Sequence, residues 1–306
     1  MEADSVSTYN YSIQFATGKF WANNHVHVVR GFDKLNNRFL FHYLRSMKFI
    51  PFLTGGTRAK LTKGKMLEIK IPLPPLPIQQ EIVKILDTFT ELEAELEAEL
   101  EARNKQYEHY RGELLTFDDE VKWLTLNEVC TSINAGGDLP ENYLKGQKLP
   151  TKEFPYPIYS NGSDEKALYG YTDGYKINDE AITISARGTI GYHTVRDPKF
   201  TPIVRLLTLI PSNQIITSKF LNYVLDITEI GHSGGSIPQL TVPNVKKIKI
   251  PVPPLVEQER IISILDKFDA LVNDISIGLP AELSARRSQY EYYRGKLLTF
   301  KEYAKQ

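Results

Sequence analysis

Apolar and polar positions between residues 78 and 114 alternate with the period of one helix face. Apolar or aromatic side chains recur there every three or four residues, with Arg103 as the polar exception. The mean step is about 3.6 residues, the period of an α-helix. We therefore expect one continuous helix of roughly forty residues, which at about 1.5 Å per residue makes a rod of about 55–60 Å.

The helical pattern belongs to a unit that occurs twice. The stretch Ile71–Leu76 reads IPLPPL and precedes the first helix, while Ile250–Leu255 reads IPVPPL and precedes a second one. The positions that then match in pairs are Gln79/Gln258, Ile82/Ile261, Ile85/Ile264, Leu86/Leu265, Asp87/Asp266, Phe89/Phe268, Tyr107/Tyr290, Tyr110/Tyr293, Arg111/Arg294 and Gly112/Gly295. The second helical pattern contains Gly278-Leu279-Pro280, so we expect that helix to break or kink near Gly278.

Two amphipathic helices of this length need something to cover their apolar stripes. The first carries the tetrapeptide ELEA three times, from Glu91 to Ala102. Each tetrapeptide turns by about 400°, so its leucines drift slowly around the helix axis. The simplest arrangement is an antiparallel pair in which each helix covers the other. In the alternative, each helix lies on its own domain, and half of its stripe has nothing beneath it.

The segments before each helix predict globular α/β units. Residues 1–70 match the later part of such a unit, with a strand in Phe20–Arg30, a short helix that begins near Phe39, and a strand in Met66–Ile71. Residues 121–250 repeat this ending but add a front part, Trp123–Tyr192, that has no counterpart in the first copy. We therefore expect the first unit to be incomplete.

Composition is that of an ordinary folded protein. The chain has 306 residues, 42% of them hydrophobic and 24% charged, and its formal net charge is zero. The first helix is acidic, with ten acids and four bases between residues 81 and 117, so the rest of the chain is mildly basic. The single cysteine suits a reducing compartment, and we find neither a secretory signal nor a membrane-spanning stretch, so we expect a cytoplasmic protein.

Enzymatic motifs are weak or missing. Gly231–Gly235 matches the G-x-S-x-G pattern of hydrolases, but the prolines that follow oppose the helix that a nucleophile elbow needs, so these glycines are better explained as loop formers. His25 and His27 could face a metal from one strand, yet no cysteine or paired carboxylate stands nearby. The sequence contains no phosphate-binding P-loop and no amino-methyltransferase motif. We expect a protein that is not an enzyme.

Two small, polar, glycine-rich loops are the better candidates for function. Tyr159–Ser163 and Ser185–Gly191 let backbone amides approach phosphates, and Arg187 could reach a guanine edge. Each could equally be an ordinary turn. The side chains that we expect to contact DNA in the second unit are Asn161, Lys166, Arg187, Thr189, His193, Ser236 and Gln239. In the first unit they are Asn24, His25, Arg58 and Lys60.

The chain as a whole resembles the specificity subunit of type I restriction-modification systems. The resemblance rests on the two IPxPPL helix starts, on the endings Gln106–Arg111 and Gln289–Arg294, on the ELEA tract, and on Gly278–Pro280. It covers essentially the whole chain. It is strongest to the subgroup in which the first long helix carries tandem tetrapeptides.

The resemblance implies an α/β fold with two target recognition domains, one complete and one partial, separated by a pair of long antiparallel coiled-coil helices. Each domain would read one half of a split double-stranded DNA site, and the tetrapeptide count would set the spacing between the halves. The implied domains are a partial recognition domain at 1–70, spacer helices at 71–117 and 251–306, and a second recognition domain at 118–250.

The resemblance also implies partners. Two methyltransferase subunits would clamp onto the assembly and bind S-adenosylmethionine, restriction subunits would join through them, and this chain would hold no cofactor itself. Members of the family normally begin with a complete first domain. The alternative is therefore a truncated coiled-coil remnant that binds methyltransferase without reading DNA, or a half-subunit that needs a second copy of itself.

Overall fold

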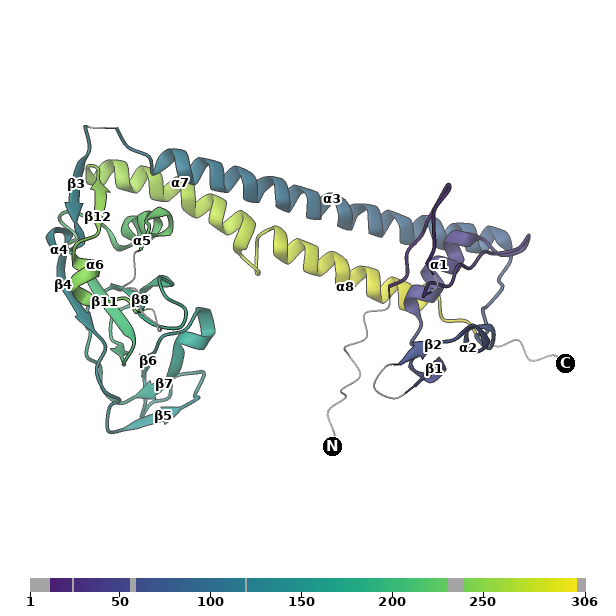
Figure 1. Ribbon diagram of the computed structural model, residues 1–306, viewed down its shortest axis with the longest axis horizontal. Coiled ribbons are helices and arrows are strands. Elements are labelled where there is room, and N and C mark those ends of the chain that lie inside the picture. The colour runs from purple at the N-terminus through teal and green to yellow at the C-terminus, as the bar shows by residue number, and fades with distance from the viewer. Residues whose placement is uncertain (1–11, 24, 56–58, 119, 231–238, 302–306) are drawn as a thin grey trace. The chain divides into compact units, whose positions relative to one another are not determined.

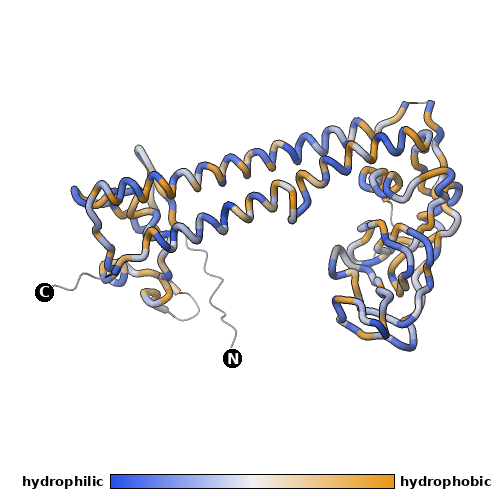
Figure 2. The backbone as a smooth tube through the Cα atoms, turned by 180° about the vertical axis from the view of Figure 1, so that it is seen from behind, coloured by the Kyte–Doolittle hydropathy of each residue, from blue (hydrophilic) through white to orange (hydrophobic). Residues whose placement is uncertain are grey.

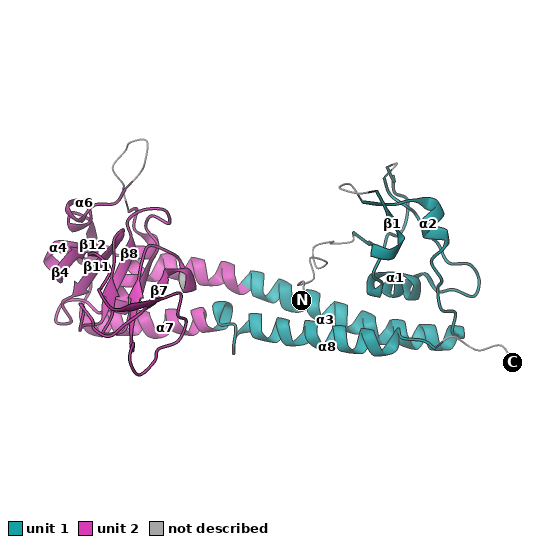
Figure 3. Cartoon of the chain, turned by 90° about the horizontal axis from the view of Figure 1, so that it is seen from below, with its two compact units in different colours: residues 1–102, 271–306 teal, residues 103–270 magenta. Residues whose placement is uncertain are grey.

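The computed structural model describes residues 12–301 apart from 24, 56–58, 119 and 231–238 (Figure 1). The chain divides into two compact units, and each combines segments that are distant in sequence (Figure 3). Unit 1 consists of residues 1–102 and 271–306, and unit 2 of residues 103–270. Each unit thus takes the start of one long helix and the end of the other.

Unit 1 is mainly helical. Its elements are α1 (Asn37–Ser46), the 3-10 helix η1 (Ile50–Phe52), the short antiparallel strands β1 (Leu53–Thr54) and β2 (Lys60–Leu61), α2 (Lys63–Leu67), the first part of α3 (Leu76–Leu114), and α8 (Leu279–Leu297). The core joins three of these segments and consists of Phe39, Ile82, Leu86, Tyr290 and Leu298. Helix α1 begins where the side chain of Asn36 accepts hydrogen bonds from the backbone amides of Arg38 and Phe39.

Unit 2 is an α/β domain. Its elements are β3 (Lys122–Thr125), α4 (Leu126–Val129), β4 (Cys130–Ala135), β5 (Tyr143–Lys145), β6 (Tyr156–Tyr159), the 3-10 helix η2 (Asp164–Ala167), β7 (Leu168–Thr172), β8 (Ala181–Ser185), β9 (His193–Arg196), β10 (Thr201–Pro202), β11 (Leu206–Pro211), α5 (Ser218–Ile227), α6 (Val242–Lys246), β12 (Lys249–Val252), most of α7 (Leu255–Asn273), and the end of α3. One sheet has the antiparallel order β4-β11-β8-β9, and a second has the order β10-β6-β7-β5. Strand β8 is buried along its whole length, and α5 packs against β8, β9 and β11.

The long helices pair within each unit. In unit 1, Phe89 of α3 stacks on Tyr293 of α8 with 5.5 Å between ring centroids, and Arg287 of α8 lies 2.6 Å from a Glu93 carboxylate oxygen and also contacts Glu97. Residues that advance along α3 meet residues that recede along α8, so this pair is antiparallel. Hydrophobic and hydrophilic positions alternate along both helices in Figure 2.

The matching contact in unit 2 is made by the same repeated positions, but here the tyrosines come from α3 and the phenylalanine comes from the second repeat. Tyr107 and Tyr110 of α3 stack on Phe268 of α7, with ring centroids 6.3 and 5.5 Å apart. The expected pairing of the two long helices is confirmed. So is the break, since α7 ends at Asn273 and α8 begins after Gly278 with proline in its first turn.

Two expected strands in unit 1 are wrong. The described part of Phe20–Arg30 forms no strand, although its counterpart in unit 2 is β11, which lies between β4 and β8. Residues Met66–Ile71 hold the end of α2 and no strand, whereas their counterpart includes β12, which pairs with β3. A strand needs a hydrogen-bonding neighbour, and the described part of unit 1 offers none at either place.

The missing neighbours leave apolar side chains in the open. Val26, Val28 and Val29 are 56%, 59% and 46% exposed. The matched residues of β11, Leu206, Thr208 and Leu209, are at most 2% exposed. The same apolar pattern is therefore buried in one unit and open in the other.

Candidate nucleic-acid interface

Two loops of unit 2 meet beside the end of β8. The loop after β6 contains Asn161, and the side-chain amide of Asn161 donates a 2.8 Å hydrogen bond to the Arg187 carbonyl in the loop between β8 and β9. Gly188 follows with φ +79°, and a Cβ there would lie 3.1 Å from the Asn161 nitrogen. Glycine thus permits both the left-handed turn and the close approach of Asn161.

Backbone bonds bring two further segments to the same place. The Ala186 amide donates to the Arg205 carbonyl at 2.9 Å, and the Leu240 amide donates to the Ala186 carbonyl at 2.9 Å. Arg205 itself has φ +71°, an uncommon value for a residue other than glycine. The segments around residues 161, 187, 205 and 240 therefore form one loop cluster, which we call the β8 loop cluster.

Positive side chains stand on the β8 loop cluster and beside it. Arg187 is partly exposed, and its guanidinium makes no hydrogen bond or ion pair with the described residues of the chain. Lys166 is exposed on η2, which follows the Asn161 loop. Arg196 is instead held by a cation–π contact within the protein, because its guanidinium lies 3.9 Å from the centroid of the Tyr159 ring. Of these three, Arg187 and Lys166 are the better placed to meet a phosphate or a base edge.

The expected contact residues are only partly brought together. Asn161, Arg187 and Gln239 belong to the β8 loop cluster, Lys166 stands beside it, and Thr189 is exposed at the tip of the β8–β9 loop. Ser236, Asn24 and Arg58 lie outside the described residues. In unit 1, His25 and Lys60 are exposed, and Lys60 lies on β2.

His193 faces inward. Its Nδ1 lies 2.8 Å from the Gly191 carbonyl, and its Nε2 lies 3.2 Å from the Asn222 carbonyl and 3.3 Å from an Asp226 carboxylate oxygen. Burial alone would lower the pKa of His193, but the hydrogen bonds to Asp226 and to the carbonyls outweigh it, so the pKa is raised. The imidazolium is therefore more favoured here than in a free histidine, and it can donate from both nitrogens.

In each unit, a buried glutamine on the long helix is hydrogen-bonded to the segment that precedes a shorter helix, α1 in unit 1 and α5 in unit 2. In unit 2, the Gln258 amide nitrogen donates to the Ile215 and Pro253 carbonyls at 2.9 Å each, and its oxygen accepts from the Thr217 amide at 3.0 Å. Gln79 makes the corresponding three bonds in unit 1, to the Lys34 and Pro74 carbonyls and from the Asn36 amide. The sequence shows both glutamines as repeated residues without revealing this role.

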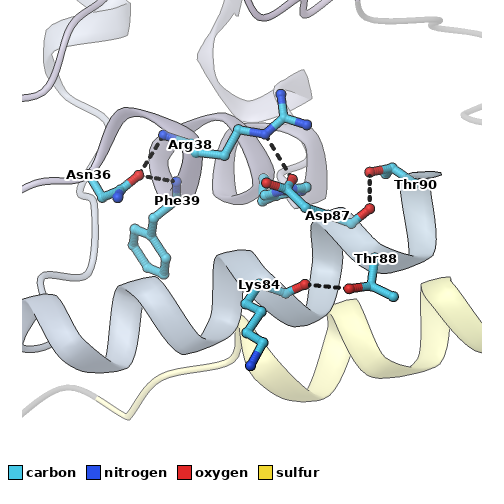
Figure 4. A network of polar contacts seen from close by, with 8 residues as sticks. Asn36, Arg38, Phe39, Lys84, Asp87, Thr88 and Thr90 are labelled. Carbon is cyan, nitrogen blue, oxygen red and sulfur yellow. Dashed lines mark hydrogen bonds and ion pairs between the residues drawn. The ribbon is translucent and has the colours of Figure 1, made fainter.

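A repeated aspartate adds a second connection. In unit 1, Asp87 accepts from Arg38 at 2.8 Å and lies 2.7 Å from Nε2 of His42, as Figure 4 shows for the arginine. Burial lowers the pKa of His42 and outweighs its hydrogen bond to Asp87, so the neutral ring is favoured. In unit 2, Asp266 accepts from Lys219 and Tyr223 at 2.7 and 2.8 Å. The aspartate is thus repeated while its partners have changed.

Other chemistries find little support in the described residues. Among them, no group of three His, Cys, Asp or Glu side chains could hold a metal ion, and the Nε2 of His27 lies 2.8 Å from the Leu61 carbonyl. None of the helices drawn in Figure 1 is both long and apolar enough to cross a membrane. The G-x-S-x-G stretch, Gly231–Gly235, lies entirely outside the described residues.

Comparison with known proteins decides the family. The model of the type I restriction modification DNA specificity domain matches residues 4–102 and 118–285, which is most of the chain. The chain belongs to the type I specificity subunit family. This confirms the resemblance seen in the sequence and the expected fold class.

Two relatives show how far the similarity extends. A chain of Haemophilus influenzae named as a type I restriction enzyme specificity subunit is 45% identical over 320 residues, covering 98% of this chain and 81% of its own length. The EcoR124I/EcoR124II specificity subunit of Escherichia coli is 35% identical over 290 residues, covering 86% of this chain and 70% of its own length. A crystal structure of the S subunit from M. genitalium has the same fold, with a TM-score of 0.58 at 20% identity over 88% of this chain and 74% of its own.

Proposed function

We propose that this specificity subunit selects the DNA target of a type I restriction-modification complex. The β8 loop cluster of unit 2 reads one half of a bipartite site, and unit 1 is a partial second reader through His25 and Lys60. The chain itself is non-catalytic and binds no cofactor, since methyl transfer belongs to partner subunits that bind S-adenosylmethionine. The complex works in the cytoplasm, and restriction subunits join through the methyltransferases.

The observation that carries this proposal is the placement of Arg187. Asn161 holds the backbone of Arg187, and the segments of Arg205 and Leu240 hold its neighbour Ala186. The Arg187 guanidinium makes no hydrogen bond or ion pair with the described residues. A guanidinium presented from an ordered loop can donate two hydrogen bonds to the O6 and N7 atoms of guanine. Flexible surface arginines lack this preorganisation.

Arg187→Ala is expected to lower the preference for the cognate half-site about 5- to 150-fold, the equivalent of about 1–3 kcal/mol for a lost bidentate base contact. The measurement is binding of the assembled methyltransferase complex to cognate and scrambled DNA. Lys152→Ala is the control, because Lys152 is exposed in unit 2 and precedes β6, away from the loop that contains Asn161. An unchanged preference in the Arg187 variant would remove the arginine from the reading surface.

The partners that we propose are two methyltransferase subunits, one for each repeat of the helix ending. Tyr110 and Tyr293 occupy matched positions and are 37% and 44% exposed. Gly112 and Gly295 follow two residues later inside helices, and a Cβ on either would meet nothing within 4 Å. Glycine inside a helix costs about 0.5–1 kcal/mol, and the described packing of the chain does not require it at either place.

A partner that approaches closely would explain why both glycines are present. Gly112 lies in an open hollow that is also lined by Glu108, His109, Glu113 and Thr116. The same helix ending recurs at Gly295. Two equivalent surfaces suit two copies of one partner.

Gly112→Leu and Gly295→Leu test this arrangement. Each is expected to leave the chain as stable as before or more stable, and to weaken binding of one methyltransferase by at least about tenfold through overpacking. Native mass spectrometry should then show one bound methyltransferase for each single variant and none for the double variant. Ala98→Leu, at an exposed position of α3, is the control. Two bound subunits in the double variant would contradict the assignment.

The second candidate function is a remnant or half-subunit that binds methyltransferase without reading DNA. The exposed valines of unit 1 favour it for that unit alone. Methylome sequencing of a host that carries this gene with its methyltransferase separates the candidates. A defined split motif supports the reader, and an assembled complex that methylates no defined site supports the remnant.

A further inference from the structure

The β8–β9 loop of unit 2 is closed at its neck by backbone bonds. The Ser185 amide donates to the Tyr192 carbonyl at 2.8 Å, and the Gly191 amide donates back to the Ser185 carbonyl at 3.0 Å. Beyond the neck, the Tyr192 amide donates to the Thr189 carbonyl at 3.1 Å. These bonds close the loop, but they do not fix the orientation of the half of the loop that contains Arg187.

Asn161 holds the Arg187 side of the loop. Its amide nitrogen donates to the Arg187 carbonyl at 2.8 Å, and its amide oxygen accepts from the Ser160 hydroxyl at 3.2 Å. An asparagine that reads adenine uses both of these atoms on the base. In this structure each of the two atoms already makes one hydrogen bond within unit 2, so reading a base with both would require the side chain to share or give up these bonds. Asn161 is therefore better suited to hold the loop than to read a base.

His193 holds the opposite side. One ring nitrogen contacts the Gly191 carbonyl, and the other contacts the Asn222 carbonyl and the Asp226 carboxylate on α5. The side chain is only 9% exposed, so it is not presented to a ligand. The ring therefore ties the end of the loop to α5, the helix whose N-cap residue, Thr217, donates its backbone amide to Gln258.

We infer that Asn161 and His193 are positioning residues, which fix the β8–β9 loop at its two sides so that Arg187 and Thr189 meet the DNA in one orientation. This inference rests on the proposed function. It goes further in two ways. Asn161 and His193 are assigned to holding the loop and not to contacting DNA, and the sequence preference then depends on residues that touch no base. General affinity for DNA comes from phosphate contacts elsewhere and does not depend on them.

The test is a double-mutant cycle in the assembled methyltransferase complex. Binding of Asn161→Ala, Arg187→Ala and the double variant is measured on cognate DNA and on a set with single base-pair changes. We expect Asn161→Ala to lower the preference about tenfold at the same base pair as Arg187→Ala, and the double variant to be no worse than Arg187→Ala alone. The dependence of affinity on salt should stay that of the unaltered complex, because phosphate contacts remain.

Two further variants supply a control and a second test. Asn142→Ala is the matched control, since Asn142 also donates from its side chain, to Asp173, but lies in another part of unit 2. His193→Gln is the second arm, because glutamine keeps a donor yet cannot span from Gly191 to α5, and we expect it to behave as Asn161→Ala does. If the His193 variant fails to fold, the Asn161 cycle still decides.

Several results would overturn the inference. Additive effects in the cycle, or a lost preference at a base pair that Arg187 does not read, would make Asn161 a direct contact. An unchanged preference would remove it from the mechanism, and a lower unfolding temperature with a flatter salt dependence would make it merely structural. If the unaltered complex prefers no sequence at all, the proposed function fails and this inference with it. If Arg187→Ala lowers the sequence preference as proposed but Asn161→Ala and His193→Gln do not, the proposed function stands and only the inference fails.

Discussion

Replacing Phe39 with alanine is expected to destabilise unit 1 by about 3–5 kcal/mol, the cost of deleting a fully buried aromatic ring. Phe39 is 0% exposed and lies in the core with Leu86 of α3 and Tyr290 of α8. Its ring also makes an edge contact with Phe300 at 6.1 Å. One side chain thus contributes to the packing of α1, the start of one repeat, and the end of the other.

Hydrogen exchange followed by mass spectrometry measures this effect in the whole chain. Amides of α1 and of α3 near Leu86 should lose protection together, while those of β8 in unit 2 should keep theirs. Phe32→Ala is the control, because Phe32 belongs to the same unit and is 66% exposed, so its change should stay within about 0.5 kcal/mol. Equal effects of the two variants would show that the core in unit 1 is not the one described.

Gln258→Leu should destabilise unit 2 by about 2–4 kcal/mol, although leucine is the more hydrophobic residue. The reason is that Gln258 is 0% exposed and satisfies three backbone groups, namely the Thr217 amide and the Ile215 and Pro253 carbonyls. Leucine would leave all three buried without a partner. Protection of α5 and of the start of α7 should fall together.

Gln258→Glu separates hydrogen bonding from size. Glutamate has nearly the same volume, but its carboxylate cannot donate to the two carbonyls, so we expect a loss at least as large as that of leucine. Glu259→Leu is the control at the neighbouring exposed position. If Gln258→Glu were neutral, the connection between α7 and the segment before α5 would depend on packing and not on the donated hydrogen bonds.

The repeated polar residues were visible in the sequence, but their use was not. Gln79 and Gln258 stand out as polar positions that recur among apolar ones. Their bonds go to backbone groups more than forty positions earlier, at Lys34 and Ile215, as well as to the nearby prolines. Backbone acceptors leave no mark in a sequence, because every residue carries one. The pattern therefore predicted that these residues matter without predicting what they bind.

The strand errors have a different cause. Val26, Val28 and Val29 alternate and cluster as strand residues do, and the matched stretch of unit 2 is the strand β11. Local preference was the same in both units, but strand formation depends on a neighbouring edge. The candidate site followed the same rule, since the loops around Asn161 and Arg187 were found by composition, whereas the inward direction of His193 was decided by α5.

The sequence by itself determined the duplicated unit, the two long helices with their break at Gly278, and the family, because helix period, proline position and repeated motifs are properties of neighbouring residues. Only the tertiary structure decided that each unit is built from the start of one repeat and the end of the other. It also decided which polar side chains support a loop and which are left to meet a ligand. Both depend on contacts between residues far apart in the chain, whose free energy is absent until the chain has folded.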